Sequence, residues 1–238
     1  MKRESRLFGR LALVAVVGTA VFSQPLALWA ADAPAAGGDK NLEPLKLQLP
    51  MPTLKGTPED LPKGPNIEPL SDKPRPPFLV PPGVKNVSQG KKVTASVNPF
   101  TGELTQITDG QKEAFDDQAV EFKKGTQWVQ VDLGEPFKIY AVAVWHDHRY
   151  IQLFKSVIVQ VSDDPDFKTS VTTLYNNDAD NSSGLGIGTD RQYFETRYGR
   201  IVDGKGVSGR YVRSYTKGSS QSAINVHQEV EVFALPAK

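Results

Sequence analysis

The chain has 238 residues and an apolar content of 39%, which is enough for one or two modest domains with hydrophobic cores. Its formal net charge is +1, so electrostatics gives no reason to expect nucleic acid or an anionic membrane as a partner. The chain contains no cysteine, which excludes disulfides, thiolate metal ligands and cysteine nucleophiles. If the protein is exported, packing or a bound ion must therefore provide its stability.

Residues 1–31 have the three parts of a secretory signal peptide. A basic start precedes an apolar run from Leu11 to Phe22, and small residues follow from Ala30 to Ala33. The run is shorter than the roughly 20 residues of a membrane-spanning helix. We expect cleavage, no transmembrane segment afterwards, and a secreted, periplasmic or cell-envelope location. An uncleaved N-terminal anchor is the alternative.

Residues 32–83 form a proline-rich segment. It contains 13 of the 18 prolines, all between Pro34 and Pro82. Such spacing excludes both a helix and a central strand, so we expect an extended linker or a strap on the domain surface. Scattered leucines, such as Leu45 and Leu47, are compatible with a docked strap. The sequence leaves the free linker and the docked strap open.

Residues 84–238 show short apolar alternations separated by turn residues, without a helical period. This pattern predicts an all-β, antiparallel sandwich or barrel. The expected strands cover residues 92–96, 126–133, 138–146, 156–162, 172–175, 209–216 and 229–234. Between Trp128-Val-Gln-Val-Asp-Leu-Gly134 and the next apolar run, a Gly-Glu-Pro turn is expected. Residues 176–209 are predicted to be one long irregular stretch, of the kind that is often functional or mobile.

Six motifs in this region resemble those of a discoidin domain, the C-type module of coagulation factors. They are Lys92-Val-Thr-Ala-Ser96, Ile107-Thr-Asp-Gly110, Trp128 to Gly134, Val157-Ile-Val-Gln-Val-Ser-Asp-Asp164, Gly209-Arg-Tyr-Val-Arg213 and Glu229-Val-Glu-Val-Phe233. The resemblance implies a galactose-binding-like β-sandwich of jelly-roll topology that binds its ligand with loops at one end. Many bacterial carbohydrate-binding modules share this fold. The stretch before Gly209 is longer than in the family, which indicates an insertion.

The resemblance also implies a structural calcium ion. In this family an Asp-Gly near the first strands and an acidic residue near the last strand often hold the ion together with backbone carbonyl groups, and Asp109 and Glu229 occupy these places. Carboxylate and carbonyl oxygens are the ligands that Ca²⁺ takes. The alternative is that Asp109-Gly110 is an ordinary turn and Glu229 a solvated strand residue.

All three histidines of the chain lie in two motifs, His146-Asp-His148 and His227. Residues i and i+2 of a strand project from the same face, so the three imidazoles could share one site if the strand of His227 lies alongside. Imidazoles can hydrogen-bond sugar hydroxyl groups or coordinate a metal ion. A ligand site, a metal site and ordinary packed or surface histidines all remain open.

Arg149 and Tyr150 follow these histidines directly, in a predicted loop. Arginine offers a bidentate donor and tyrosine a flat apolar face, which together suit a sugar ring. Solvated loop residues are the alternative. Trp128 and Trp145 stand at strand edges, and we expect them to pack in the core rather than to serve as sugar platforms.

The sequence favours an exported, non-catalytic binding module that recognises a carbohydrate or another cell-envelope component through the loops at one end. A second hypothesis is a structural or accessory subunit that docks on a partner protein. A metal enzyme built on the three histidines is the third. No Ser-His-Asp order, recognisable pair of catalytic carboxylates or phosphate-binding loop is present, which agrees with a protein that is not an enzyme.

Overall fold

The computed structural model describes residues 41–52, 55–71 and 73–237. The chain divides into two compact units, and the second, Asp39–Lys238, contains all of the described residues. The predicted signal peptide lies outside them. No helix in the described part of the chain is long and apolar enough to cross a membrane.

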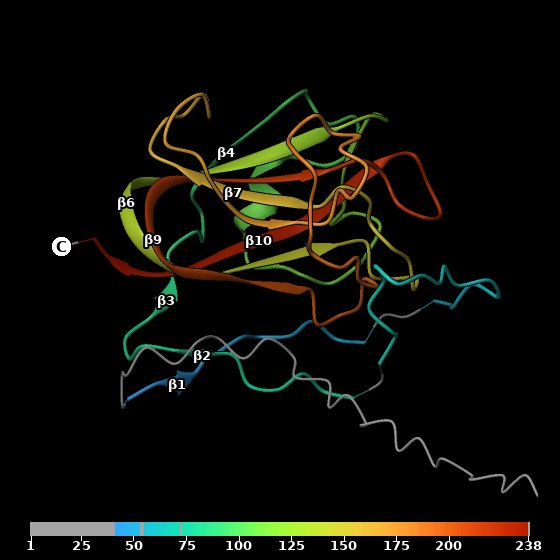
Figure 1. The fold of residues 1–238 in the computed structure, drawn as a ribbon, viewed down its shortest axis with the longest axis horizontal. Coiled ribbons are helices and arrows are strands. Elements are labelled where there is room, and N and C mark those ends of the chain that lie inside the picture. Colours follow the sequence, from blue (N-terminus) through green and yellow to red (C-terminus); the bar gives the residue numbers. More distant parts are fainter. Residues whose placement is uncertain (1–40, 53–54, 72, 238) are drawn as a thin grey trace, which may run out of the picture. The chain divides into compact units, whose positions relative to one another are not determined.

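The described residues form ten strands and one short 3-10 helix, η1 (Figure 1). The strands are β1 (Glu43–Pro44), β2 (Leu79–Val80), β3 (Lys85–Asn86), β4 (Lys92–Ala95), β5 (Val120–Phe122), β6 (Gln127–His146), β7 (Ile158–Ser162), β8 (Thr172–Asn176), β9 (Arg200–Thr216) and β10 (Asn225–Pro236), and η1 covers Leu104–Thr108. All pairings between these strands are antiparallel. The predicted all-β, antiparallel class is confirmed.

The long strands β6 and β9 run through both layers of the sandwich. The first half of β6 pairs with β4 and with the end of β9, and its second half pairs with β10 and the start of β9. The β6–β9 register is interrupted between Asp132 and Phe137, where Gly134 has a φ of 90°. Both strands bend sharply at the left of Figure 1. The expected Gly-Glu-Pro turn is therefore a bend within one strand, because β9 pairs with β6 on both sides of it.

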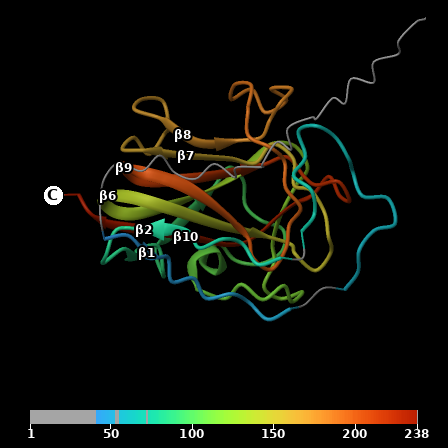
Figure 2. The same ribbon diagram turned by 60° about the horizontal axis from the view of Figure 1, so that its bottom comes forward.

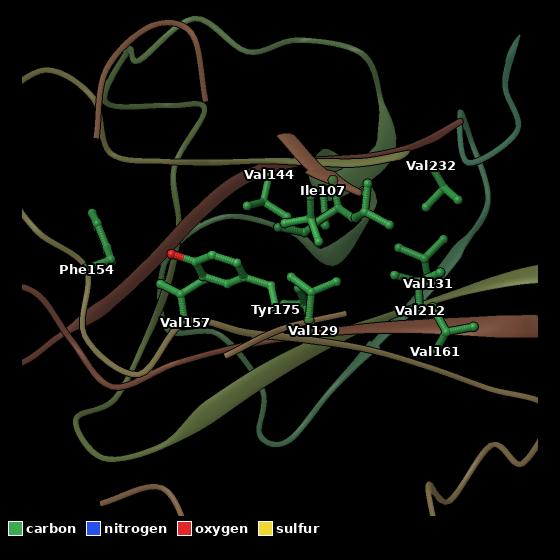
Figure 3. Close-up of a cluster of buried hydrophobic side chains, with 14 of the residues drawn as sticks. Ile107, Val129, Val131, Val144, Phe154, Val157, Val161, Tyr175, Val212 and Val232 are labelled. Atoms are coloured by element: carbon green, nitrogen blue, oxygen red, sulfur yellow. The ribbon is translucent and has the colours of Figure 1, made fainter. Parts of the chain in front are cut away.

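The hydrophobic core lies between the two halves of β6. Val129, Val131 and Leu133 face it from the first half, and Val142 and Val144 face it from the second. Valines from β7, β9 and β10 also belong to the cluster, together with Ile107, Phe154 and Tyr175 (Figure 3). The alternation predicted for Trp128 to Gly134 is thus the alternation of a strand with one face in the core.

The described part of the proline-rich segment is a docked strap, which resolves the choice that the sequence left open. Leu45, Leu47 and Phe78 pack against the outer side of β6 and β10, over a small cluster formed by Ala141, Ala143, Trp145 and Phe233. The amide of Leu45 donates a 2.7 Å hydrogen bond to the Phe78 carbonyl. In Figure 2 the strap, coloured blue to teal, follows this side of the sandwich. Trp145 is fully buried beneath it, so its predicted packing role is confirmed.

The irregular stretch predicted for residues 176–209 is shorter in the structure. Residues 200–209 form the first half of β9, and only 177–199 connect β8 to β9 without a strand. Glycines obscured this strand in the sequence because they are poor strand formers. Gly204 is needed there, since a Cβ atom at this position would lie 2.4 Å from the Ile139 carbonyl oxygen.

Candidate functional site

One end of the sandwich gathers the long loops. Because β6 and β9 bend at the opposite end, both of their termini return to this one, at the right of Figure 1. The loops are residues 147–157 after β6, 177–199 after β8 and 217–224 after β9. The predicted loop end of the fold therefore exists, and it holds both histidine motifs.

Two of the three predicted histidines, His146 and His227, come together in the structure, but beneath its surface. His227 pairs with His146 across β10 and β6, and their ring centroids are 5.2 Å apart. His146 also stacks on Phe154, at 4.5 Å. The Nε2 atom of His148 lies 2.8 Å from the Lys112 carbonyl oxygen. His146, His148 and His227 are 0%, 2% and 1% exposed, so a ligand in solvent does not reach them in this conformation.

A buried acid accompanies this histidine pair. Oε2 of Glu195, from the insertion, lies 2.8 Å from His146 Nδ1, and both side chains are completely buried. The sequence pointed to no partner for His146, because an isolated glutamate in a loop carries no motif. Burial lowers the pKa of His227, and the neighbouring His146 lowers it further. Within the described residues, no group of three or more His, Cys, Asp or Glu side chains could hold a metal ion.

The guanidinium group of Arg149 is hydrogen-bonded to carboxylates of the protein itself. Its Nε and Nη2 atoms donate to Asp147 at 2.8 and 2.9 Å, and its Nη1 atom donates to Asp116. The hydrogen bond with Asp147 is the main reason that its pKa is raised, although burial opposes this. Tyr150 is 43% exposed and lies beside strap residue Gly56. Tyr150 is thus the accessible member of the predicted ligand-binding set, and that these residues contact a ligand stays a prediction.

The two residues predicted to bind calcium lie next to each other. The Gly110 amide donates to both carboxylate oxygens of Glu229, at 3.2 and 3.3 Å, and Asp109 Oδ1 accepts from the Gln111 amide. Glu229 is fully buried rather than a solvated strand residue. Burial raises its pKa to about 9, and the charges of Glu231 and Asp109 add to the shift. A buried carboxyl group with acidic neighbours fits a cation, and calcium here stays a prediction.

An open polar cleft of about 470 Å³ lies at the same end. It is lined by Lys155, Ser156, Asn177, Asp178, Ala179, Asp180, Ser182, Gln192 and Lys217. No single residue of this set was predicted to bind a ligand. The signal that the sequence did contain is the long polar insertion, which supplies most of the lining.

Asp178 holds together the loop that lines the cleft, because its carboxylate accepts several hydrogen bonds. Its carboxylate accepts hydrogen bonds from the amides of Ser182 and Ser183 and from the hydroxyl groups of Ser156, Ser182 and Ser183. Burial opposes ionisation of Asp178, but the bonds from Ser183 and Ser182 outweigh it and hold its pKa below the usual range. Asp178 therefore shapes the loop as a structural acceptor, and Asp180 is the exposed carboxylate of the lining.

The polar lining groups of the cleft come from three separate segments. Asn177 uses its Oδ1 atom to accept from the Val157 amide, while its Nδ2 atom is buried without a hydrogen-bond partner. Lys217 donates from Nζ to the Ser182 carbonyl at 2.8 Å. The Lys217 amide also bonds the Lys155 carbonyl, which places the two lysines side by side. The cleft thus brings amide, ammonium and carboxylate groups together.

Residues 106–214 match the family model described as NedA-like, galactose-binding domain. This part of the chain resembles a galactose-binding-like, discoidin-type domain. The match runs from η1 to the second half of β9 and so includes the bend of β6 and the insertion. The family resemblance expected from the six motifs is confirmed. No curated protein matches the chain.

Solved structures similar to the chain include a family 89 glycoside hydrolase from Clostridium perfringens, with 16% identity and a TM-score of 0.48. That match covers 64% of this chain and 15% of the hydrolase. The CBM32 of AlyQ, in complex with 4,5-unsaturated mannuronic acid, is 20% identical with a TM-score of 0.43, over 60% of this chain and 93% of that one. A chitosan-binding module from Paenibacillus sp. IK-5 is 21% identical with a TM-score of 0.40, over 62% and 98%.

Proposed function

We propose that this discoidin-type domain is a non-catalytic carbohydrate-binding module that holds a saccharide in the polar cleft. The main support for this proposal is the position of the cleft at the loop end, where loops from three parts of the chain supply its lining. Resemblance to the galactose-binding-like family supports the ligand class. A fixed concave site with a few convergent polar groups is typical of small-ligand binding.

The chemistry of the lining suits sugar hydroxyl groups. A hydroxyl group donates one hydrogen bond and accepts others, so it needs both kinds of partner. Lys155 and Lys217 offer donors, and Asp180 offers an acceptor. The lining residues include no aromatic side chain, so hydrogen bonds rather than ring stacking would hold the saccharide.

A glycan array followed by calorimetry of its strongest ligand tests this proposal on the full chain. We expect binding that Asp180→Ala and Lys217→Ala weaken. Lys168→Ala is the matched control, because Lys168 is an exposed lysine in the loop between β7 and β8, away from the cleft lining. The proposed site would be refuted if no neutral, acidic or amino sugar on the array binds. It would also be refuted if neither cleft variant changes the affinity for the ligand.

A docking role on a partner protein is a second candidate, favoured by the outer side of the strap. Leu42, Leu49 and Met51 are 42%, 40% and 62% exposed there. Apolar strap residues that face solvent are candidates for contacts with another protein. Affinity purification of the full chain tests this role. A stoichiometric protein partner that Met51→Ser releases would favour it, and purification without one would favour the saccharide.

We also propose that the domain works outside the cytoplasm and binds calcium at Asp109 and Glu229. The signal-like start of the chain supports export. Buried Glu229 beside Asp109 supports the ion, since both carboxylates are hard oxygen ligands. N-terminal sequencing of the protein recovered from an exporting host tests the first point. Calcium titration of chelator-treated protein tests the second.

A further inference from the structure

The strap does more than cover an apolar surface, because it also pairs with the insertion. Ile67 and Gln192 form a parallel β-bridge. The Gln192 amide donates to the Asn66 carbonyl at 2.8 Å, and the Gln192 carbonyl accepts from the Glu68 amide at 2.7 Å. Both backbone hydrogen-bonding groups of Gln192 are thus directed to the strap.

Side chains reinforce the same pairing. Arg191 donates from Nη2 to the Ile67 carbonyl at 2.5 Å. Arg200, at the start of β9, donates from Nη1 to both carboxylate oxygens of Glu68, at 2.8 and 3.0 Å. Residues 66–68 are therefore tied to the insertion on each side of Gln192.

Gln192 is also a wall of the polar cleft. The other lining residues of the insertion, 177–182, are held by hydrogen bonds within the loop and to Ser156 and Val157. The insertion folds back on itself up to the bond between the Asp190 amide and the Asn176 carbonyl, at 3.0 Å. Beyond Asp190 the backbone of Gln192 bonds to the strap instead, so its position is set by a segment far away in the sequence.

We propose that residues 66–68 of the strap are a positioning element of the cleft, which hold Gln192 where it contacts the saccharide. This inference rests on the proposed function. Without the strap, the amide and carbonyl groups of Gln192 would turn to water, and this wall of the cleft would become mobile. Binding would then have to order the wall again, which lowers affinity. The strap thus preorganises the cleft for ligand binding.

A matched pair of substitutions at Glu68 tests the role of the backbone. Glu68→Ala removes the carboxylate that pairs with Arg200 but keeps the amide donor. Glu68→Pro removes both, and the neighbouring Pro69 shows that the strap is compatible with proline. We expect Glu68→Pro to weaken binding of the array-selected saccharide roughly five- to tenfold relative to Glu68→Ala, the range for one hydrogen bond. Equal affinities of the two variants would overturn the proposal.

Hydrogen exchange gives a readout that needs no ligand. The Gln192 amide should exchange slowly in the wild type and in Glu68→Ala, and faster in Glu68→Pro, while β6 amides stay protected in all three. Unchanged exchange of Gln192 in Glu68→Pro would overturn the proposal even if no saccharide is found. Failure of the wild type to bind any saccharide would instead count against the cleft as a site, since the exchange data would still report the pairing.

A double-mutant cycle separates positioning from a general loss of stability. Gln192→Ala keeps the backbone pairing and removes the side chain that lines the cleft. If the strap acts through Gln192, Glu68→Pro should cost little further affinity in the Gln192→Ala background. Additive losses would show that the strap acts by another route and would overturn the proposal.

Discussion

His227 lies opposite His146 across strands β10 and β6, with ring centroids 5.2 Å apart and an interplanar angle of 54°. Phe154 stacks on His146, and the edge of Phe122 meets His227. The two imidazoles are thus enclosed by aromatic rings at the base of the loops. Their place in the molecule favours a role in the stability of the loop end.

This pair should make the domain sensitive to acid. Burial, and then His146, hold the pKa of His227 well below its ordinary value of 6.5. Unfolding frees this imidazole to bind a proton, so its contribution to stability is present above pH 6.5 and is lost as the pH falls below 6.5. A single such group changes the free energy of unfolding by at most about 1.4 kcal/mol per pH unit. Urea titrations at pH 8 to 5 should show a decline that His227→Gln reduces, and an equal slope in both proteins would contradict it.

Glu229 should have the opposite dependence on pH in metal-free buffer. Its pKa is about 9 in the folded protein and near 4.5 when unfolded, mainly because of burial. The unfolded state then loses its proton first, so stability falls as the pH rises from 4.5 to 9. Glu229→Gln should flatten this decline in chelator-treated protein. If calcium binds, it should favour the ionised carboxylate and raise the wild-type melting temperature at pH 8 but not that of Glu229→Gln.

Gly188 should be required for the insertion to pack against Asn176 at the end of β8. A Cβ atom at this position would lie 2.2 Å from the Asn176 carbonyl oxygen, and the Gly188 amide donates to the Asp178 carbonyl. Gly188→Ala should therefore displace the loop, at about 1–3 kcal/mol of stability, and weaken saccharide binding. Gly56→Ala is the control, because a Cβ atom there meets nothing within 4 Å. Denaturant titration and calorimetry of both variants check this, and a Gly188→Ala protein with wild-type affinity would contradict it.

Lys217 should contribute a charged donor to the cleft. Lys217→Ala should reduce saccharide affinity about tenfold, as expected for one hydrogen bond to or from a charged group. Because Lys217 also bonds the Ser182 carbonyl, Lys217→Arg should recover part of the affinity by keeping the charge near this loop. The melting temperatures of both variants should stay close to that of the wild type. Equal affinities of the wild type and Lys217→Ala would exclude this residue from the site.

The sequence by itself determined the β-class, the family resemblance and most of the strands. These features depend on local alternation, as in Val129, Val131 and Leu133, which a strand expresses wherever its neighbours lie. The sequence also marked the polar insertion as the part that distinguishes this chain. It could not give the true length of β9, because glycines at the bend replace the expected strand residues.

Only the tertiary structure decided where each candidate site residue lies and whether it is buried. Whether His146 is exposed depends on the loops and on β10, which come from distant parts of the sequence. The same holds for the strap, whose docking on Trp145 and pairing with Gln192 leave no local pattern. Burial and convergence arise from long-range pairing, and the spacing of residues along one strand does not contain them. The burial of the histidines is the reason that we propose the cleft, rather than the histidines, as the saccharide site.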